Sequence, residues 1–295
     1  MKRTAFIAIV GRPNVGKSTL LNAILGEKVA IVSNKPQTTR NRITGIFTKG
    51  DDQFVFLDTP GMHSPKNSLG EFMVKAADTS MRDADAVVLV IDTGKEITTV
   101  EENVISYLKK SGIPAILALN KIDMYDREQL AETISKYAEK HDFVAFVPIA
   151  AKKGKNVPEL MDECSKFLSE SDWFFPEDMI TDQPERQIAA EIIREKILRT
   201  LNKEIPPGTA VVIEEFKDEG SPIRIRAEIF CEKASHKGII VGKGGEALKL
   251  IGTYAREDLE KMLGVKVYLN LWVKVKENWR ESARTVSNFG YRDED

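Results

Sequence analysis

The chain has 295 residues, which corresponds to about two domains at ~100–200 residues per domain. A hydrophobic content of 42% and a net charge of −2 exclude a disordered chain, and the absence of any run near ~18 apolar residues argues against a membrane span. The near-neutral charge gives no sign of a nucleic-acid partner. The two cysteines, Cys164 and Cys231, are too few to crosslink a chain of this length, so we expect buried thiols in a cytoplasmic protein.

Short apolar runs alternate with stretches of helical period over residues 1–170. The predicted strands are Ala5–Val10, Gln53–Leu57, Ala86–Ile91, Ala115–Leu119 and Phe143–Val147, and the predicted helices are Ser18–Leu25, Val100–Lys110, Glu128–Lys140 and Val157–Phe167. This alternation predicts an α/β domain with a mostly parallel sheet covered by helices on both faces. Ile43–Thr48 precedes the turn-like Lys49–Asp52, which predicts one antiparallel edge strand.

The pattern changes after this first domain. Residues 171–185 are rich in aromatic and acidic side chains, so we interpret them as an ordered connector rather than a flexible linker. Residues 186–295 then follow the order α-β-β-α-α-β, which predicts a small α+β domain. Its elements are expected at Gln187–Leu201, Ala210–Phe216, Ile223–Phe230, a helix before the Gly-rich turn, Gly245–Leu263 and Lys266–Val275, with a last short helix at Glu281–Ser287.

A glycine-rich motif joins the first strand to the first helix. Gly11–Ser18 matches G-x-x-x-x-G-K-[ST], and such a loop directs backbone N–H groups at phosphate while the helix N-terminus adds a favourable dipole. Lys17 is expected to reach the β- and γ-phosphates, and the Ser18 hydroxyl to bind Mg²⁺. The predicted phosphate-binding residues are Gly11, Asn14, Val15, Gly16, Lys17, Ser18 and Thr19.

Two further motifs follow predicted strands and specify the nucleotide. In Asp58–Gly61, the carboxylate at the strand end can hold Mg²⁺ and the Gly61 N–H can bond the γ-phosphate. In Asn120–Asp123, Asp123 can accept hydrogen bonds from guanine N1–H and the exocyclic amine, which adenine lacks. Asn120 is expected to brace this loop, and the Lys121 stem to cover the base. The three motifs, in this order, predict a GTP site.

With these motifs, the chain resembles the Era family of bacterial ribosome-associated GTPases over essentially its whole length. The blocks that carry the resemblance are Gly11–Ser18, Gln37–Arg40, Asp58–Gly61, Asn120–Asp123, Phe175–Asp182, Glu191–Lys196 and Leu271–Lys276. The resemblance implies GTP/GDP and Mg²⁺ as ligands and makes Gln37–Arg40 a switch loop. Within it we favour Thr39 over Thr38 as the Mg²⁺ ligand beside Ser18 and Asp58, although spacing cannot decide. Lys17, Thr39 and Gly61 are the predicted catalytic residues.

The chain departs from the common GTPase pattern at two positions. Ala150-Ala151-Lys152 stands where S-A-K is usual, so we expect the base to be held by the Ala151 backbone N–H, next to Ala150. Met62 stands where many GTPases place a water-orienting Gln, which predicts slow intrinsic hydrolysis. Asn14 resembles the Asn that binds K⁺ in related potassium-activated GTPases. Two interpretations of Asn14 stay open: it binds a K⁺ ion, or it only braces the loop.

The second domain resembles a type II KH domain, because a G-x-x-G loop lies between its two central helices. The predicted RNA-binding residues are Lys237, Ile240, Val241, Gly242, Lys243, Gly244, Gly245 and Lys249. Basic residues outnumber acidic ones around this loop and along the last strand, although a solvated basic face is the alternative. The aromatic residues Tyr268, Trp272 and Trp279 are expected to pack in the core or between domains rather than to stack on bases.

The family resemblance further implies a GTP switch that binds the 3′ end of 16S-type small-subunit ribosomal RNA and acts in 30S subunit assembly. We expect a monomer in the cytoplasm. Peripheral contact with the inner face of the membrane stays open, since an amphipathic surface suffices for it. Two alternatives also remain at this stage. One is an RNA-binding module whose nucleotide is merely structural, and the other is a membrane-associated or tRNA-modifying GTPase.

Overall fold

The computed structural model describes residues 1–33, 35, 37–201 and 208–292. The chain divides into two compact units. The first contains Met1–Pro65 and Met73–Asp182, and the second contains Lys66–Phe72 and Gln183–Asp295. Among the described residues, no helix is both long and apolar enough to cross a membrane.

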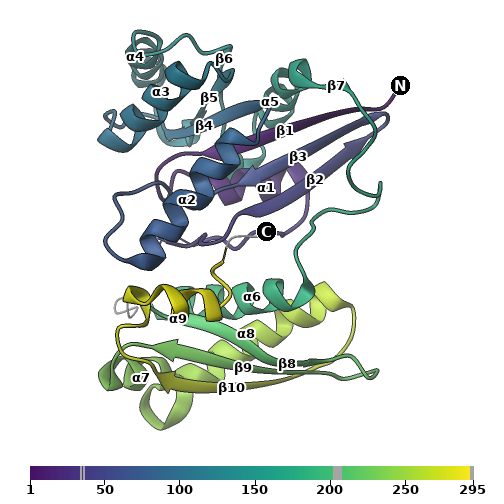
Figure 1. Ribbon diagram of the computed structural model, residues 1–295, viewed down its shortest axis with the longest axis vertical. Coiled ribbons are helices and arrows are strands. Elements are labelled where there is room, and N and C mark those ends of the chain that lie inside the picture. The colour runs from purple at the N-terminus through teal and green to yellow at the C-terminus, as the bar shows by residue number, and fades with distance from the viewer. Residues whose placement is uncertain (34, 36, 202–207, 293–295) are drawn as a thin grey trace. The chain divides into compact units, whose positions relative to one another are not determined.

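The first unit is built on one sheet whose main strands lie in the order β2-β3-β1-β4-β5-β6, with a short β7 beside β1 (Figure 1). The strands are β1 (Arg3–Val10), β2 (Ile43–Lys49), β3 (Asp52–Asp58), β4 (Ala86–Asp92), β5 (Ala115–Asn120), β6 (Ala145–Pro148) and β7 (Ser169–Glu170). The pairs β3-β1, β1-β4, β4-β5 and β5-β6 are parallel, whereas β2 pairs antiparallel with β3. The predicted antiparallel edge strand is confirmed, and β7 adds a short antiparallel pairing that was not predicted.

Helices cover both faces of this sheet. They are α1 (Lys17–Leu25), α2 (Ser68–Arg82), α3 (Thr99–Ser111), α4 (Arg127–Ala138) and α5 (Val157–Cys164). Alternate residues of β1 point to opposite faces, as a strand period of two requires. Ile7 and Ile9 belong to the core under α1 and α5, and Ala8 and Val10 to the core under α3 and α4. Both cysteines are buried free thiols, as expected.

Helix α2 was not predicted, although its sequence contains apolar residues at helical spacing. Leu69, Met73, Ala77 and Met81 are all buried at a spacing of four residues. This is the period of a helix with one apolar face. The pattern is less clear in the sequence because Phe72 and Val74 are also apolar but lie off this face, among small and polar residues.

Residues 173–182 form an ordered connector on the first unit, along β2 and β3. The buried Gln53 side chain accepts hydrogen bonds from the Phe174 and Phe175 N–H groups at 3.0 and 3.1 Å and donates to Phe175 O at 2.9 Å. The Ile46 N–H of edge strand β2 donates to Ile180 O at 2.9 Å. The connector therefore satisfies polar backbone groups on an edge strand that would otherwise remain open.

The second unit is a three-stranded sheet in the order β10-β9-β8, with β9 parallel to β10 and antiparallel to β8. Its elements are α6 (Glu185–Thr200), β8 (Ala210–Lys217), β9 (Ile223–Cys231), α7 (Ala234–Val241), α8 (Glu246–Leu263), β10 (Val267–Val275) and α9 (Ala283–Asn288). Figure 1 shows α6 and α8 together on one face of the sheet. This order of elements and the parallel β9-β10 pair match the predicted type II KH fold.

We predict that Gln53→Met destabilises the first unit by about 1–3 kcal/mol and loosens the connector. The variant keeps the side-chain volume but removes the partners of partly buried backbone groups at Phe174 and Phe175. Urea denaturation followed by circular dichroism measures the stability, and limited proteolysis measures cleavage within residues 173–182. Lys49→Met, at the exposed end of β2, is the control and should leave both unchanged. Equal proteolysis of Gln53→Met and wild type would show that Gln53 does not hold the connector.

Candidate functional site

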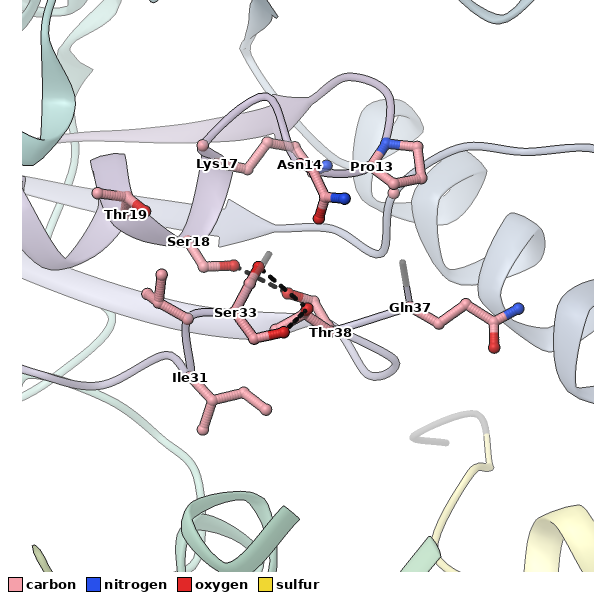
Figure 2. A pocket seen from close by; sticks show the side chains of 13 residues that line it. Pro13, Asn14, Lys17, Ser18, Thr19, Ile31, Ser33, Gln37 and Thr38 are labelled. Atoms are coloured by element: carbon pink, nitrogen blue, oxygen red, sulfur yellow. Dashed lines mark hydrogen bonds between the residues drawn. The ribbon is translucent and has the colours of Figure 1, made fainter. Parts of the chain in front are cut away.

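The loop between β1 and α1 wraps backbone around a polar pocket (Figure 2). Two of its glycines are required by close approach as well as by positive φ angles. A Cβ on Gly11, at φ 147°, would lie 2.3 Å from Val90 O, and a Cβ on Gly16, at φ 105°, would lie 2.3 Å from Asn120 Nδ2. Only glycine fits at these positions, so the backbone can turn toward an anion at the N-terminus of α1.

Lys17 is the first residue of α1 and is almost fully buried beside the loop. Its ammonium donates hydrogen bonds to Gly11 O at 2.9 Å and to Arg12 O at 3.1 Å. Burial lowers the pKa of Lys17 to about 8, and the charge of Asp58 opposes that shift. The side chain is thus a positioned cation whose full charge is favoured when a further anion approaches.

Three oxygen-bearing side chains converge beside Lys17. Ser18 Oγ donates to Asp58 Oδ2 at 2.6 Å and lies 2.8 Å from Thr39 Oγ1. Asp58 ends β3 and is fully buried, and its Oδ1 has no hydrogen-bond partner among the described residues. Burial raises the pKa of Asp58 to about 6, against the opposing effects of Lys17 and Ser18. Hydroxyl and carboxylate oxygens are the ligands that Mg²⁺ prefers, so this set fits a magnesium ion carried by a nucleotide phosphate.

The two adjacent threonines of the switch loop have different surroundings. The Thr39 hydroxyl faces Ser18, and Thr39 as a whole is only 6% exposed. The Thr38 hydroxyl instead donates to Lys35 O at 2.6 Å and lies 2.9 Å from Ser33 Oγ. Figure 2 shows Ser33 and Thr38 directed toward one another, joined by a dashed line. This geometry favours Thr39 as the metal ligand, a choice that spacing left open.

Ile31, Val32 and Ser33 also line the pocket, and sequence reasoning did not identify them. They precede the switch motif in a loop without a recognisable pattern. Gly61 also lines the pocket, and a Cβ added there would lie 2.8 Å from Pro13 Cα. The predicted phosphate residues Asn14, Gly16, Lys17, Ser18 and Thr19 all line the same pocket, whereas Val15 is buried and uses its carbonyl to hold Asn120.

Asn120, at the end of β5, ties the phosphate loop to the predicted base loops. Its Nδ2 donates to Val15 O at 2.7 Å, and its Oδ1 accepts from Lys121 N at 2.8 Å and Ala151 N at 3.0 Å. The bracing role predicted for Asn120 matches these contacts. The Ala151 N–H is engaged by Asn120 here, so its predicted bond to guanine requires this hydrogen bond to be shared or replaced. Ala150 is buried beside it.

Lys121 and Asp123, in the loop after β5, are both held by ion pairs. The Lys121 ammonium donates to Asn14 O and to Asp92 Oδ2, both at 3.0 Å, which fixes its stem over the loop. Asp123 is exposed and pairs with Lys153 at 2.9 Å, and the hydrogen bond from Lys153 lowers the pKa of the Asp123 carboxyl. Asp123 is therefore an acceptor-only carboxylate at neutral pH, as recognition of two guanine donors requires.

The second unit carries the G-x-x-G loop between α7 and α8. Gly242 needs to be glycine because a Cβ there would lie 2.7 Å from Ala247 Cβ. Gly244 and Gly245 have φ angles of 61° and 84° and face open space. The three charged residues predicted to bind RNA are all exposed, namely Lys237, Lys243 and Lys249.

A groove begins at this loop and runs between α8 and edge strand β10. Its helical wall is formed by Gly245, Leu248, Lys249, Gly252, Thr253 and Arg256, and its strand wall by Val267, Tyr268, Leu269 and Leu271. Gly252, Arg256 and Tyr268 were not among the predicted RNA-binding residues, because only the fold brings them together along this groove. Val241 is partly exposed.

Two expectations about apolar residues are corrected here. Ile240 is fully buried in the core of the second unit, so its side chain offers no surface to RNA and supports α7 from beneath. Tyr268 and Trp272 were expected to be packed, yet they are 60% and 57% exposed. They occupy alternate positions of β10 that point away from the core. Trp279 is buried, as expected, and donates to Gly208 O at 2.6 Å.

Comparison with known proteins agrees with the two domains. The 50S ribosome-binding GTPase family matches residues 6–121, and the KH domain family matches residues 204–280. GTPase Era of Clostridium kluyveri is 50% identical over 293 residues, covering 99% of this chain and 100% of the relative. GTPase Era of Alkaliphilus oremlandii is 52% identical over 291 residues, covering 98% and 99%.

Two solved structures are similar over nearly the whole chain, each at 42% identity. One is Aquifex aeolicus Era, as a single-residue variant bound to GDP and AlF₄⁻, with a TM-score of 0.93 and coverage of 98% of this chain and 99% of that one. The other is Era in complex with MgGDPNP and nucleotides 1506–1542 of 16S ribosomal RNA, with a TM-score of 0.94 and coverage of 99% of both chains. The class is thus a P-loop GTPase with a second, KH domain. More specifically, the chain belongs to the Era family of GTPases.

We predict that the affinity for magnesium GDP is highest between about pH 6 and pH 8. Binding needs Asp58 ionised and Lys17 protonated, and burial raises the pKa of Asp58 to about 6 while it lowers that of Lys17 to about 8. Below pH 6, affinity should fall about tenfold per pH unit, because a proton must leave Asp58 before the metal binds. Titration calorimetry from pH 5 to pH 9 measures this profile.

Asp58→Asn is the control for this profile, because it cannot ionise. Its affinity for magnesium GDP should be lower at every pH, and the fall in affinity below pH 6 (the acid limb of the profile) should be absent. If the acid limb persists unchanged in the variant, the limb arises from the nucleotide phosphates and the role given to Asp58 is wrong.

Proposed function

We propose that this protein is a GTP-hydrolysing switch that binds the 3′ end of small-subunit ribosomal RNA and acts in maturation of the 30S subunit. One observation carries the proposal. A single chain combines the Ser18–Thr39–Asp58 oxygen cluster beside Lys17 with an open groove that starts at Gly242–Gly245. The Era structure bound to MgGDPNP and 16S ribosomal RNA supports the same pairing of ligands for this chain.

In the proposed nucleotide site, Lys17 and the backbone of Gly11–Thr19 hold the phosphates. Ser18, Thr39 and Asp58 hold Mg²⁺, which neutralises charge that develops on the transferred phosphoryl group. Gly61 contacts the γ-phosphate, and loss of that phosphate releases the Thr39 segment. Asn120 and Ala151 shape the base pocket with Ala150, while Lys121 covers the base and Asp123 reads its edge.

In the proposed RNA site, the Gly242–Gly245 loop clamps the backbone of about four nucleotides. Lys237, Lys243 and Lys249 add positive charge at this loop, and Val241 and Leu248 offer apolar surface. The outer edge of β10 carries backbone groups that no strand pairs among the described residues, so they can hydrogen-bond to bases.

The proposal extends to the setting in which the protein works. We place it on the small ribosomal subunit as a monomer in the cytoplasm. Peripheral contact with the inner face of the cell membrane is its second proposed location, and such contact needs only an amphipathic surface rather than a spanning helix.

We predict that guanine is selected through Asp123. Inosine triphosphate lacks the exocyclic amine of guanine, so wild type should bind it about 10- to 100-fold more weakly than GTP, since a hydrogen bond to a charged group is lost. In Asp123→Ala the two nucleotides should bind with similar, weak affinity. Competition against a fluorescent GDP measures both ratios. A GTP preference that survives in Asp123→Ala would contradict the assignment.

We predict that Gly244→Asp abolishes RNA binding and leaves GTP binding unchanged. The added carboxylate would repel phosphate where Gly244 now faces open space. Gly244→Asn is the matched control, because Asn tolerates the same positive φ without the charge, and it should bind a single-stranded 16S 3′ segment more tightly than Gly244→Asp. Equal RNA affinity of Gly244→Asp and wild type, measured by fluorescence anisotropy, would remove the KH loop from the proposal.

We predict that K⁺ accelerates hydrolysis through Asn14, which lines the phosphate pocket at a positive φ of 65°. Phosphate release should be about tenfold faster in KCl than in NaCl, well below the ~10³-fold that an arginine finger supplies. Asn14→Ala should show equal, slow rates in both salts. Equal rates for wild type would leave Asn14 as a loop-bracing residue, and no turnover in either salt would favour a structural nucleotide.

A further inference from the structure

The sheet of the second unit has an outer face, opposite to the face that α6 and α8 cover. Odd-numbered residues of β9 and β10, such as Ile225 and Val273, belong to the core. Even-numbered residues point to the opposite face, where Tyr268 is 60% exposed and Trp272 is 57% exposed. Two large aromatic side chains therefore stand in solvent, four residues and about 13 Å apart on one strand.

The chain shields aromatic residues elsewhere on this same face. Phe230, an even-numbered residue of β9, stacks on Phe289 at a centroid distance of 4.3 Å and an interplanar angle of 26°. Phe289 also contacts the buried Trp279 at 5.1 Å. Because one end of the face is covered by the segment around α9, the exposure of Tyr268 and Trp272 is a local exception.

The exposed part of this face carries an excess of positive charge. By register, Arg224 lies beside Tyr268 and Arg226 beside Asn270, and both arginines are exposed. The basic residues here are Lys217, Arg224, Arg226 and Lys274, and the acidic ones are Glu214 in the β8 bulge, Glu215 and Glu228. Glu228 pairs with Lys274, and Glu215 pairs with Lys217 at 3.5 Å and with Arg226 at 3.9 Å.

The charged aromatic face continues from the groove proposed to bind RNA. Tyr268 lines the groove and also lies at the start of the outer face. An RNA strand that leaves the groove beside Tyr268 therefore meets Trp272 on the same side of β10. Tyr268 has Arg224 as its cross-strand neighbour, and Trp272 has Glu228, whose charge is neutralised by Lys274. Exposed aromatic rings on such a face suit single-stranded nucleic acid, since every base has a face that can stack. The G-x-x-G loop engages only about four nucleotides, so a longer RNA needs a second surface.

We propose that this outer face, with Trp272 as its stacking residue and Arg224 as its phosphate contact, binds single-stranded RNA that extends beyond the KH groove. The proposal deepens the RNA-binding function proposed above and rests on it for the identity of the ligand. A protein partner is the competing occupant of such a face. The excess positive charge and the continuity with the groove favour RNA.

The test compares two RNA probes on the full-length protein with a non-hydrolysable GTP analogue. The short probe is about six nucleotides from the single-stranded 3′ segment of 16S ribosomal RNA, enough to fill the groove. The long probe extends the same sequence by about six nucleotides on each side. Fluorescence anisotropy gives the affinity of each probe for wild type, Trp272→Ala and Trp272→Phe.

Trp272→Ala should weaken the long probe by about 5- to 150-fold, the range expected when one stacked base loses its aromatic partner, and should leave the short probe unchanged. Trp272→Phe should keep most of the affinity because it keeps a ring. Arg224→Gln should reduce the salt slope for the long probe by about 0.7, the value for one lost phosphate contact on a single strand. GTP turnover should stay at the wild-type rate in all three variants.

Equal binding of the long probe by Trp272→Ala and wild type would overturn the proposal. An equal loss on both probes would also overturn it, because Trp272 would then act through the shape of the groove. If Trp272→Ala loses association with small ribosomal subunits while both RNA affinities are unchanged, the occupant is a protein. Failure of wild type to bind the short probe would instead contradict RNA binding in the KH groove, because the role of the outer face is tested by the affinity for the long probe.

Discussion

The nucleotide site of the first unit depends on two opposite charges that are buried together, Lys17 at the start of α1 and Asp58 at the end of β3. Lys17 and Asp58 are both removed from water, which disfavours each charged form, as the directions of their pKa shifts indicate. Their mutual attraction and the hydrogen bonds to Ser18, Gly11 and Arg12 partly offset this cost. A phosphate with its magnesium ion supplies the missing counter-charges, so the same burial that costs free energy favours that ligand.

The surrounding geometry keeps these charges in place through a small number of contacts. Asn120 joins the phosphate loop to both predicted base loops with one side-chain amide, and its closeness is the reason that Gly16 carries no Cβ. On the other side, the Thr39 segment leads directly into β2. That strand is hydrogen-bonded to the connector, through Ile46 to Ile180 and through Thr44 to Thr181. The phosphate site and the connector are thus separated by one short strand.

The second unit shows why net charge was a poor guide to its partner. Residues 181–295 contain 20 basic and 20 acidic residues, yet the basic ones gather at the G-x-x-G loop and on the outer sheet face. Ion pairs neutralise Glu215 and Glu228 on that face. A local excess of charge on a neutral domain suits a ligand held at one place, because the non-specific attraction to phosphate stays small.

The sequence by itself determined the local chemistry: the phosphate loop, the guanine motif, the G-x-x-G loop and the order of nearly all the elements. These features depend on residues adjacent in the chain, where spacing and backbone preference act directly. Only the tertiary structure placed the Thr39 hydroxyl, rather than that of Thr38, against Ser18, engaged the Ala151 N–H with Asn120, buried Ile240 and exposed Trp272. Strand alternation tells which residues share a face, but whether that face is covered depends on elements far away in the chain.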